Sequence, residues 1–576
     1  MAGKSGLGLT IGRAGRLAYA ASSGPAAWRG IALYGAILSL NFLGVWISLK
    51  QITWSRDFFD ALEQVDTPEV LRQVGVFVAL TAASAGAWLI ADYLNKGLVI
   101  RLRERLTGQA LALWLGNRAY WMLRPGYGVT PVENPDQRIA EDCALFVRRF
   151  LEFTLELISQ AVAIVSYVAL LWSLSGFALR FAAFGLEIEI AHYMFWLAPL
   201  YVALASVITH LLGRPLKGLY FARERVEGDF RHALVRLRDS ADQVAMTGGE
   251  EAEERRLAAR FAAIRDNWHL IMRRELIMGL FNRPYFQTVM RVPTFLALPA
   301  YLAGALTLGG MMQLASAFTQ VTTTLSWFIF NYRDLSEFVA VCERLDGLMA
   351  AARDPRPLPT APRLLRREMS NDGSLRLEGV RLATPDGRWL DKIAGYQVRR
   401  GARLWLAGAS GQGKTTLLSA IAGYWHWGEG RITLPKGRMV LLPAGAPVLA
   451  DAILAAACHP EDPARHDPAR LRAVLTRLGL GHRLDPEMIE TSLTGLSMGE
   501  RQRLGLARAV LLRPDWLLMD EATSALDPAA EGDLLGWLAA ELPDTTFIMV
   551  AHRLPAGIAL DDTLHLGSQG PERKTA

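Results

Sequence analysis

The first 330 residues of this chain contain a series of long apolar stretches. A helix that crosses a bilayer needs about 20 mostly apolar residues. Six stretches of this kind occur, at residues 28–49, 70–94, 151–174, 193–212, 287–308 and 311–330. Because only helices and closed barrels satisfy the polar backbone inside lipid, the sequence predicts six membrane-spanning helices.

Basic residues are unevenly distributed between these stretches. The loops at residues 95–150 and 213–286 are rich in Arg. By contrast, Arg180 is the only basic residue besides His192 in residues 176–192, and the turn at Gly309 contains no basic residue. Since basic loops stay on the cytoplasmic side, the N-terminus, both long loops and everything after the sixth span are expected in the cytoplasm. This pattern also accounts for the net charge of +6, so we expect a phospholipid partner and no nucleic acid.

The composition changes after the sixth stretch. Residues 351–373 hold four prolines, which is typical of a linker. From residue 374 onward, short apolar strands alternate with helices, as in an α/β domain. The expected organisation is a membrane domain at 1–350 with long cytoplasmic helical extensions, a linker at 351–373, an α/β domain at 374–568 and a tail at 569–576. The three widely spaced cysteines fit neither a disulfide framework nor a metal site.

A glycine-rich loop at residues 408–415 follows an apolar strand and precedes a helix. This is the setting in which a phosphate loop works, because its backbone N–H groups and the helix N-terminus converge on phosphate oxygens. The side chain of Lys414 can reach the β and γ phosphates of ATP, and the Thr415 hydroxyl can bind Mg²⁺. The candidate nucleotide-binding residues are Gly408, Ala409, Ser410, Gly411, Gln412, Gly413, Lys414, Thr415 and Thr416.

Two acids end an apolar strand about a hundred residues later. Asp520 is placed to hold Mg²⁺, together with Thr415. Glu521 is suited to act as the general base on an attacking water. An acidic pair alone is weak evidence, but together with the phosphate loop it predicts an α/β P-loop nucleotide-binding domain that uses ATP and Mg²⁺.

Residues 496–502, with the sequence Leu-Ser-Met-Gly-Glu-Arg-Gln, resemble the signature motif of ATP-binding cassette (ABC) proteins. Residues 524–527 resemble the D-loop of that family, and 550–553 its switch histidine. The resemblance implies a type IV, exporter-like fold. It also implies that the protein hydrolyses ATP as a homodimer. It also implies that Ser497, Gly499 and Glu500 of one subunit close the nucleotide site of the other. His552 is then expected to contact the γ-phosphate and to hold Glu521 and water in line.

Two departures from the family pattern stand out. Ala444 occupies the position where the family carries a glutamine that touches Mg²⁺, and alanine has no ligand oxygen. The aromatic platform for adenine is also absent near Thr384 and Pro385, although Trp389 could replace it or simply pack in a strand. We therefore expect ATPase activity that is weaker or less tightly coupled to transport.

The membrane half resembles the bacterial SbmA/BacA-like transporters, whose members carry vitamin B12, bleomycin and antimicrobial peptides. It also resembles the peroxisomal fatty-acyl transporters. The similar stretches are residues 54–62, 134–139, 213–216, 229–238, 249–250, 311–313 and 317–318. This resemblance implies ATP-driven transport of a bulky hydrophilic solute, such as cobalamin or a peptide, across the bacterial inner membrane. Uptake is the expected direction.

Several alternatives compete with this interpretation. Three alternatives are also consistent with the sequence: a nucleotide-gated facilitator with a weakly coupled ATPase, an exporter, and an acyl-CoA carrier. The six fused spans argue against a soluble ATPase that acts on DNA or ribosomes. Charged residues in or near the spans either form intramembrane or interfacial pairs or line an acidic, water-filled cavity. These residues are Asp92, Glu152, Glu156, Glu187, Glu189, His210 and Arg291.

Overall fold

The computed structural model describes residues 7–24, 27–124, 132–183, 186–289, 291–355, 364–370, 373–445, 452–484 and 496–567. The chain divides into two compact units. The helical unit comprises Met1–Leu113 and Asn134–Met349, and the α/β unit comprises Trp114–Glu133 and Ala350–Ala576. The segment Trp114–Glu133 therefore belongs with the α/β unit, although it lies between two membrane helices in the sequence.

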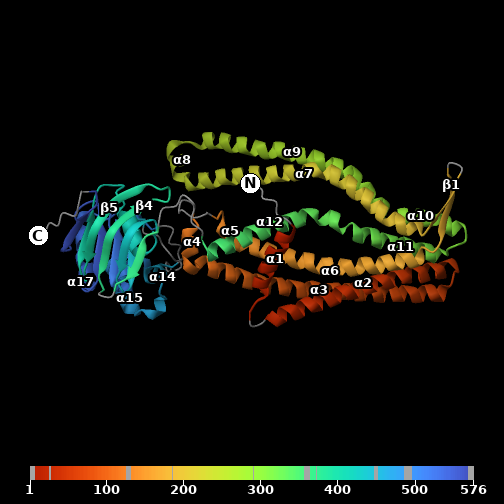
Figure 1. The fold of residues 1–576 in the computed structure, drawn as a ribbon, viewed down its shortest axis with the longest axis horizontal. Coiled ribbons are helices and arrows are strands. Elements are labelled where there is room, and N and C mark those ends of the chain that lie inside the picture. Colours follow the sequence, from red (N-terminus) through yellow and green to blue (C-terminus); the bar gives the residue numbers. More distant parts are fainter. Residues whose placement is uncertain are drawn as a thin grey trace. The chain divides into compact units, whose positions relative to one another are not determined.

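The helical unit consists of long helices and one β-hairpin (Figure 1). Its elements are α1 (Leu7–Ser22), α2 (Ala27–Glu63), α3 (Thr67–Leu115), α5 (Pro135–Gln137), the π-helical turn Arg138–Asp142, α6 (Cys143–Leu174), β1 (Ala178–Ala183), β2 (Leu186–Ala191), α7 (Tyr193–Asp239), α8 (Ala241–Thr247), α9 (Glu250–Val289), α10 (Val292–Leu302), α11 (Leu308–Leu325) and α12 (Trp327–Arg353). Helices α7 and α9 run side by side along their length (Figure 1).

The first four predicted spans coincide with helices that are long and apolar enough to cross a membrane. These helices are Ala27–Glu63, Thr67–Leu115, Pro135–Leu174 and Tyr193–Asp239. The fifth predicted span falls on the end of α9 and the short apolar helix α10, and the sixth on α11 and the start of α12. The stretch at 176–192, expected as a simple loop, contains the antiparallel pair β1 and β2.

Helix α11 lies at the centre of the packing in the helical unit. Its side chains Leu314 and Phe318 are fully buried among residues of α2, α6, α7 and α10. Its start is tied to the end of α2, because the Gly309 amide donates a hydrogen bond of 2.9 Å to the Asp60 carboxylate. Small residues such as Ala317, also fully buried, let neighbouring helices approach closely.

The α/β unit contains two sheets. The parallel sheet has the order β11-β6-β10-β9-β8, and the second sheet has the order β3-β7-β4-β5. The strands are β3 (Arg366–Met369), β4 (Leu375–Ala383), β5 (Trp389–Val398), β6 (Arg403–Ala407), β7 (Gly428–Leu434), β8 (Met439–Leu442), β9 (Trp516–Asp520), β10 (Thr546–Val550) and β11 (Asp562–His565). Strand β3 lies inside the segment that was expected to be only a linker.

Helices cover the parallel sheet on both sides. They are α13 (Lys414–Ala422), α14 (Ile453–Cys458), α15 (Pro468–Arg477), α16 (Met498–Leu512) and α17 (Pro528–Glu541). The unit also contains the short helix α4 (Ala119–Met122), which contacts Tyr424 after α13. Alternate residues of β9 face two cores: Leu518 packs with α13 and the second sheet, and Leu517 packs with the helices α14 to α17. All five residues of β9 are buried, as expected of an internal parallel strand.

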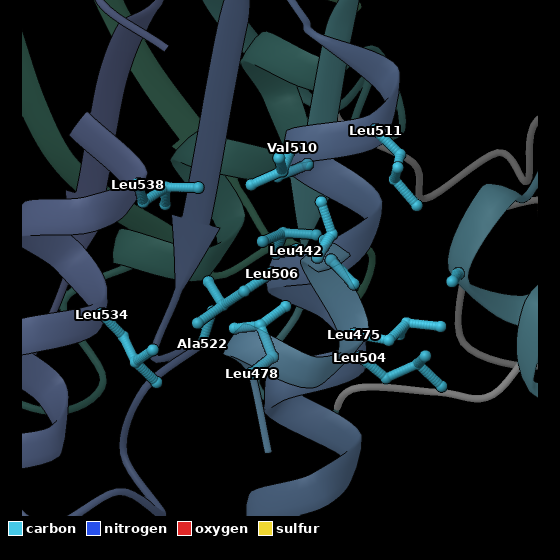
Figure 2. Packing of buried hydrophobic residues seen from close by; sticks show 14 of the residues in the cluster. Leu442, Leu475, Leu478, Leu504, Leu506, Val510, Leu511, Ala522, Leu534 and Leu538 are labelled. Carbon is cyan, nitrogen blue, oxygen red and sulfur yellow. The ribbon is translucent and has the colours of Figure 1, made fainter. Parts of the chain in front are cut away.

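Leu538 of α17 lies in the second of these cores and is fully buried, with Leu506 and Leu534 close by (Figure 2). Replacing Leu538 by Ala leaves a cavity, which we expect to lower the stability of the unit by about 2–5 kcal/mol. The thermal unfolding midpoint of the purified full-length protein measures this effect. Leu554, whose side chain is exposed, is the matched control. Equal midpoints for Leu538→Ala and Leu554→Ala would contradict the packing described here.

Candidate nucleotide-binding site

The phosphate loop connects β6 to α13. Gly413 is the residue before the first helical turn and has a φ of +94°, a conformation that side chains other than glycine rarely adopt. A Cβ atom at Gly413 would also lie 2.6 Å from a methyl carbon of Leu390, the second residue of β5. The strand β5 therefore lies directly beside the loop. This arrangement leaves the backbone N–H groups at the start of α13 available for phosphate oxygens.

Lys414 and Thr415 form the first turn of α13. The buried Lys414 ammonium donates hydrogen bonds to the carbonyl oxygens of Gly408 at 2.7 Å and Ala409 at 3.0 Å, so it lies inside the loop. The Thr415 hydroxyl donates to Asp520 Oδ1 at 3.1 Å. The Gln412 side-chain oxygen accepts a hydrogen bond from the Ala409 amide, which fixes the curl of the loop from within.

Three neighbouring parallel strands, β6, β10 and β9, end at this edge of the sheet. In register, Leu406 and Asp520 both lie opposite Val550. The loop after β6, the acids after β9 and the histidine after β10 are therefore brought together, although they are far apart in the sequence. The carboxyl edge of a parallel sheet is where ligands bind in α/β folds.

Glu521 and His552 form a pair at this edge. Glu521 Oε1 lies 3.0 Å from His552 Nε2, and the Glu521 amide donates to the Val550 carbonyl at 2.9 Å. Glu521 has a φ of +51°, an uncommon value for a residue with a side chain. Strained backbone of this kind is typical of functional sites.

Asp520 is the most buried carboxylate of the site. Burial raises the pKa of Asp520, and the neighbouring Glu521 charge acts in the same direction; the Thr415 hydrogen bond and the Lys414 charge oppose both. A divalent cation would offset the cost of keeping this carboxylate charged in its buried position.

Thr415 and Asp520 fit a magnesium ion. Mg²⁺ prefers oxygen ligands and is usually held by one or two protein groups together with substrate phosphates and water. The paired hydroxyl and carboxylate oxygens supply such a donor set beside the phosphate loop. When bound, Mg²⁺ would neutralise charge on the phosphate oxygens.

The signature residues begin α16. Ser497 is the N-cap: its hydroxyl accepts a hydrogen bond from the Glu500 amide at 3.2 Å, and the Glu500 carboxylate accepts one from the Ser497 amide at 2.9 Å. Arg483 also binds the Glu500 carboxylate at 3.1 Å. The hydrogen bonds from Ser497 and Arg483 hold the pKa of Glu500 below its ordinary value. Glu500 thus orders the start of the helix.

Within the described part of the chain, neither Ser497 nor Gly499 hydrogen-bonds to the phosphate loop of the same chain. Residues 408–416, Asp520, Glu521 and His552 lie at one edge of the sheet, whereas Ser497, Gly499 and Glu500 form a separate helix start. Gln502, to which the sequence motifs assigned no role, connects the start of the signature helix to the residues at the sheet edge.

Gln502 is almost fully buried and makes three hydrogen bonds. Its amide nitrogen donates to the Glu521 carbonyl at 3.2 Å and the Ser524 hydroxyl at 3.1 Å, and its oxygen accepts from the Ala525 amide at 2.9 Å. Gln502 therefore connects the signature helix to the turn after Glu521. The sequence signal that could have indicated this role is the position of Gln502 at the end of the signature motif.

Trp389 begins β5, one residue before Leu390. The Arg381 guanidinium lies 5.3 Å from the centre of its ring, and 38% of the side chain is exposed. A partly exposed ring next to a strand that touches the phosphate loop is available for stacking on adenine. That role stays a prediction.

Ala444 lies in the turn that follows β8, two residues after the buried Leu442. Strand β8 pairs with β9, whose last residue is Asp520, so this turn follows the same sheet edge. The position suits a side chain that reaches toward bound metal, and Ala444 provides only a methyl group.

We expect Ala444→Gln to raise ATP turnover or its stimulation by transported solute. A glutamine oxygen adds one ligand for Mg²⁺, and a hydrogen bond to a charged group contributes about 1.5–3 kcal/mol. ATP hydrolysis by full-length protein in lipid nanodiscs measures the change, with Ala469→Gln, at an exposed position of α15, as a control for an added glutamine elsewhere. Turnover and stimulation that both stay at the wild-type level would show that the residue at 444 does not limit coupling.

The site chemistry follows from these contacts. Lys414 and the N–H groups at the start of α13 can bind phosphate oxygens, and Thr415 with Asp520 can hold Mg²⁺. The Glu521 carboxylate is the group able to accept a proton from water, and His552 is placed to orient it. This arrangement suits in-line attack of water on a terminal phosphate.

Comparisons with known proteins identify the family to which the chain belongs. Residues 24–302 match the family description "ABC transporter transmembrane region 2", and residues 392–524 match "ABC transporter". The chain is 31% identical over 525 residues to the inner membrane ABC transporter ATP-binding protein YddA of Escherichia coli, covering 91% of both chains. It is 26% identical to the human lysosomal cobalamin transporter ABCD4, covering 79% of this chain and 78% of that one.

A solved structure of a bacterial Atm1-family ABC exporter with ATP bound has the same fold, with a TM-score of 0.74 and 20% identity over 96% of this chain and 95% of that one. The predicted fold class, a type IV helical membrane domain joined to a P-loop domain, is confirmed. With both of its halves matched and a 31% identical relative spanning nine-tenths of its length, this chain belongs to the ABC transporter family and couples ATP hydrolysis to membrane transport.

Proposed function

We propose that two copies of this chain form a homodimer that moves a bulky hydrophilic solute, such as cobalamin or a peptide, across the bacterial inner membrane. The observation that carries the proposal is a cavity of about 450 Å³ among α2, α3, α6 and α11 of the helical unit, lined by both polar and apolar residues. Its lining residues are Leu40, Asn41, Gly44, Val45, Ser84, Ala87, Trp88, Glu156, Ser159, Gln160, Ala163, Tyr167, Gln320, Thr323 and Thr324.

Amides and hydroxyls make up much of this lining. Such groups hydrogen-bond to polar solutes and would be costly to bury against a hydrocarbon chain. The chemistry of the cavity therefore favours a hydrophilic solute over the fatty-acyl group of an acyl-CoA.

Among the predicted intramembrane acids whose side chains the structure describes, Glu156 lines this cavity. Its Oε2 accepts a hydrogen bond of 2.6 Å from the Trp327 indole N–H, which orients the carboxylate. Two other acids form local pairs instead: Asp92 with Lys96 at 2.7 Å, and Glu152 with Arg149 at 2.9 Å. The Glu187 side chain lies outside the described residues.

The names of two relatives point the same way. The human relative is a lysosomal cobalamin transporter, and the Escherichia coli relative is an inner membrane protein. We propose cobalamin-like cargo and an inner-membrane location for this chain on that basis, with the P-loop domain in the cytoplasm. The exporter fold alone is compatible with movement in either direction, and the resemblance to SbmA/BacA-like proteins favours uptake.

A nucleotide-gated facilitator is a second candidate, favoured specifically by Ala444. In that case ATP would open a pathway without driving transport. The close pair of Glu521 and His552 argues against it, because a cassette that does not hydrolyse ATP has no need of an oriented base.

The test is ATP hydrolysis by the full-length protein in lipid nanodiscs, with cobalamin, bleomycin, a cationic peptide or an acyl-CoA added and Glu521→Gln as the blank. We expect turnover above the blank that rises with cobalamin, bleomycin or the peptide. Stimulation by acyl-CoA alone would select the acyl-CoA carrier. Solute movement in proteoliposomes that needs ATP but persists in Glu521→Gln would select the facilitator, and loading either side separately gives the direction.

A further inference from the structure

A second cavity of the α/β unit lies at the C-terminal end of α13 and has a volume of about 570 Å³. The phosphate loop lies at the other end of this nine-residue helix, about 13 Å away along its axis. The cavity is therefore separate from the nucleotide-binding site. Its lining residues are Arg118, Trp121, Met122, Leu364, Leu365, Arg367, Gly423, His426 and Trp427.

The charged residues of this lining all have the same sign. Arg118 and Arg367 are permanently cationic, His426 can gain a positive charge, and none of the lining residues is an acid. The segments 125–131 and 356–363, which adjoin these residues in the sequence but lie outside the described part of the chain, contain no Asp or Glu. The cavity thus has an excess of positive charge.

The two guanidinium groups converge on Gly423. Arg118 Nη1 donates to the Gly423 carbonyl at 2.9 Å, and Arg367 Nη2 donates to the Ala420 carbonyl. A Cβ atom at Gly423 would lie 3.1 Å from a guanidinium nitrogen of each arginine. Two like charges are therefore held close together at one wall of the cavity.

The helix carbonyls use only part of the hydrogen-bonding capacity of these arginines. A guanidinium carries five N–H donors in a planar fork. Arg367 Nε is buried and has no hydrogen-bond partner among the residues that the structure describes. Burial and the Arg118 charge lower the pKa of Arg367, and burial with both arginines lowers the pKa of His426. An anion bound here would offset the repulsion and accept the remaining donors.

The rest of the lining is mostly apolar. Met122, Leu364 and Leu365 contribute aliphatic surface beside the arginines, and the Leu364 side chain is 60% exposed. The volume of the cavity is in the range of small-molecule sites and is much larger than one inorganic ion needs. A ligand that matches both parts has an anionic group and an apolar body.

We propose that this cavity binds an amphiphilic anion, in which a phosphate or carboxylate group contacts Arg118 and Arg367 and an aliphatic or aromatic body lies against Met122, Leu364 and Leu365. Phosphate and carboxylate share the planar or branched oxygen geometry that a guanidinium fork recognises with two hydrogen bonds. The site is additional to the ATP site. It does not depend on which solute the protein transports.

The experiment uses full-length protein with Glu521→Gln in lipid nanodiscs, with saturating ATP and Mg²⁺ so that the phosphate loop is occupied. Phenyl phosphate, benzoate, inorganic phosphate and the neutral benzamide are titrated at constant ionic strength, and binding is measured by saturation-transfer NMR against nanodiscs without protein. The variants are Arg118→Ala, Arg118→Lys and the control Arg477→Ala, which removes an exposed arginine of α15 paired with Asp533.

We expect phenyl phosphate or benzoate to bind more tightly than inorganic phosphate and benzamide, because only the first two have both parts of the ligand. The tighter of the two identifies the anionic group. Arg118→Ala should weaken binding about tenfold or more, the loss expected for a hydrogen bond between charged groups. Arg118→Lys should recover part of the affinity, and Arg477→Ala should bind like the parent. The thermal unfolding midpoint of each variant verifies its fold.

The inference is overturned if neither aromatic anion binds, or if folded Arg118→Ala binds both with the affinity of the parent. A second measurement needs no variant: phenylglyoxal modification of Arg118, followed by peptide mass spectrometry, should be slowed by the tighter aromatic anion, while modification of Arg477 stays unchanged. No protection of Arg118, or equal protection of Arg118 and Arg477, would also contradict the proposed site.

Discussion

Glu521→Gln is expected to lower ATP hydrolysis by about 10²–10⁴-fold, the range that a positioned general base contributes. The amide keeps the shape of the carboxylate but cannot accept the proton of an attacking water at neutral pH. The backbone at Glu521 and its hydrogen bond to Val550 are untouched, so the site should keep its geometry. ATP binding should therefore persist. Phosphate release by full-length protein in nanodiscs and ATP affinity by calorimetry measure the two effects.

Glu429→Gln is the matched control, because Glu429 is an exposed glutamate of the same unit on β7. Its turnover should equal that of the wild type. Residual activity of Glu521→Gln within tenfold of the wild type would mean that another group accepts the proton. The pairing of Glu521 with His552 would then have only a structural role.

Lys414→Ala is expected to weaken ATP binding by about 30-fold or more, from the loss of about 2–5 kcal/mol that follows truncation of one partner of a buried charge pair. Lys414 is buried, and its ammonium lies within the loop that would surround the β and γ phosphates. Hydrolysis should fall with occupancy of the site. The measurement is ATP affinity of the full-length protein, with thermal unfolding in the absence of nucleotide to verify that the fold is intact.

Lys436→Ala is the control for loss of a lysine charge, because Lys436 is exposed in the turn before β8. It should leave ATP affinity unchanged. An affinity of Lys414→Ala equal to that of Lys436→Ala would show that the ammonium does not touch the phosphates. Together the two variants of the site separate binding from catalysis: Lys414→Ala acts on the first, Glu521→Gln on the second.

Features that depend on local pattern were predictable from the sequence. The first four spans follow from apolar length alone, because bilayer thickness sets the length of a crossing helix. The phosphate loop lies between a strand and a helix that are continuous with it in the sequence, so about a dozen neighbouring residues are enough to predict its phosphate-binding role. Asp520 and Glu521 could be predicted as site residues because they lie at the end of an apolar strand. The fold class follows from these two halves joined in one chain.

Features that depend on contacts between distant segments were decided only by the tertiary structure. Strand β3 pairs with β7 about sixty residues away, so nothing within the proline-rich segment indicated a strand. The hydrogen bonds of Gln502 to the turn after Glu521 join residues of two separate elements. The bond from Arg118 to Gly423 spans 305 positions, and Arg118 itself stands in an unremarkable basic loop.

The difference has a physical origin. Helix length, strand alternation and loop glycines are requirements of the backbone itself, so neighbouring residues must satisfy them and the sequence by itself determines them. A capped helix end or a buried amide needs only some donor or acceptor at the right place, and many residue types in many segments could provide it. Which segment does so depends on how the strands and helices pack. For this protein, the sequence determined most of the membrane helices and the residues of the phosphate loop, and the packing decided which distant groups Gln502 and Arg118 hydrogen-bond.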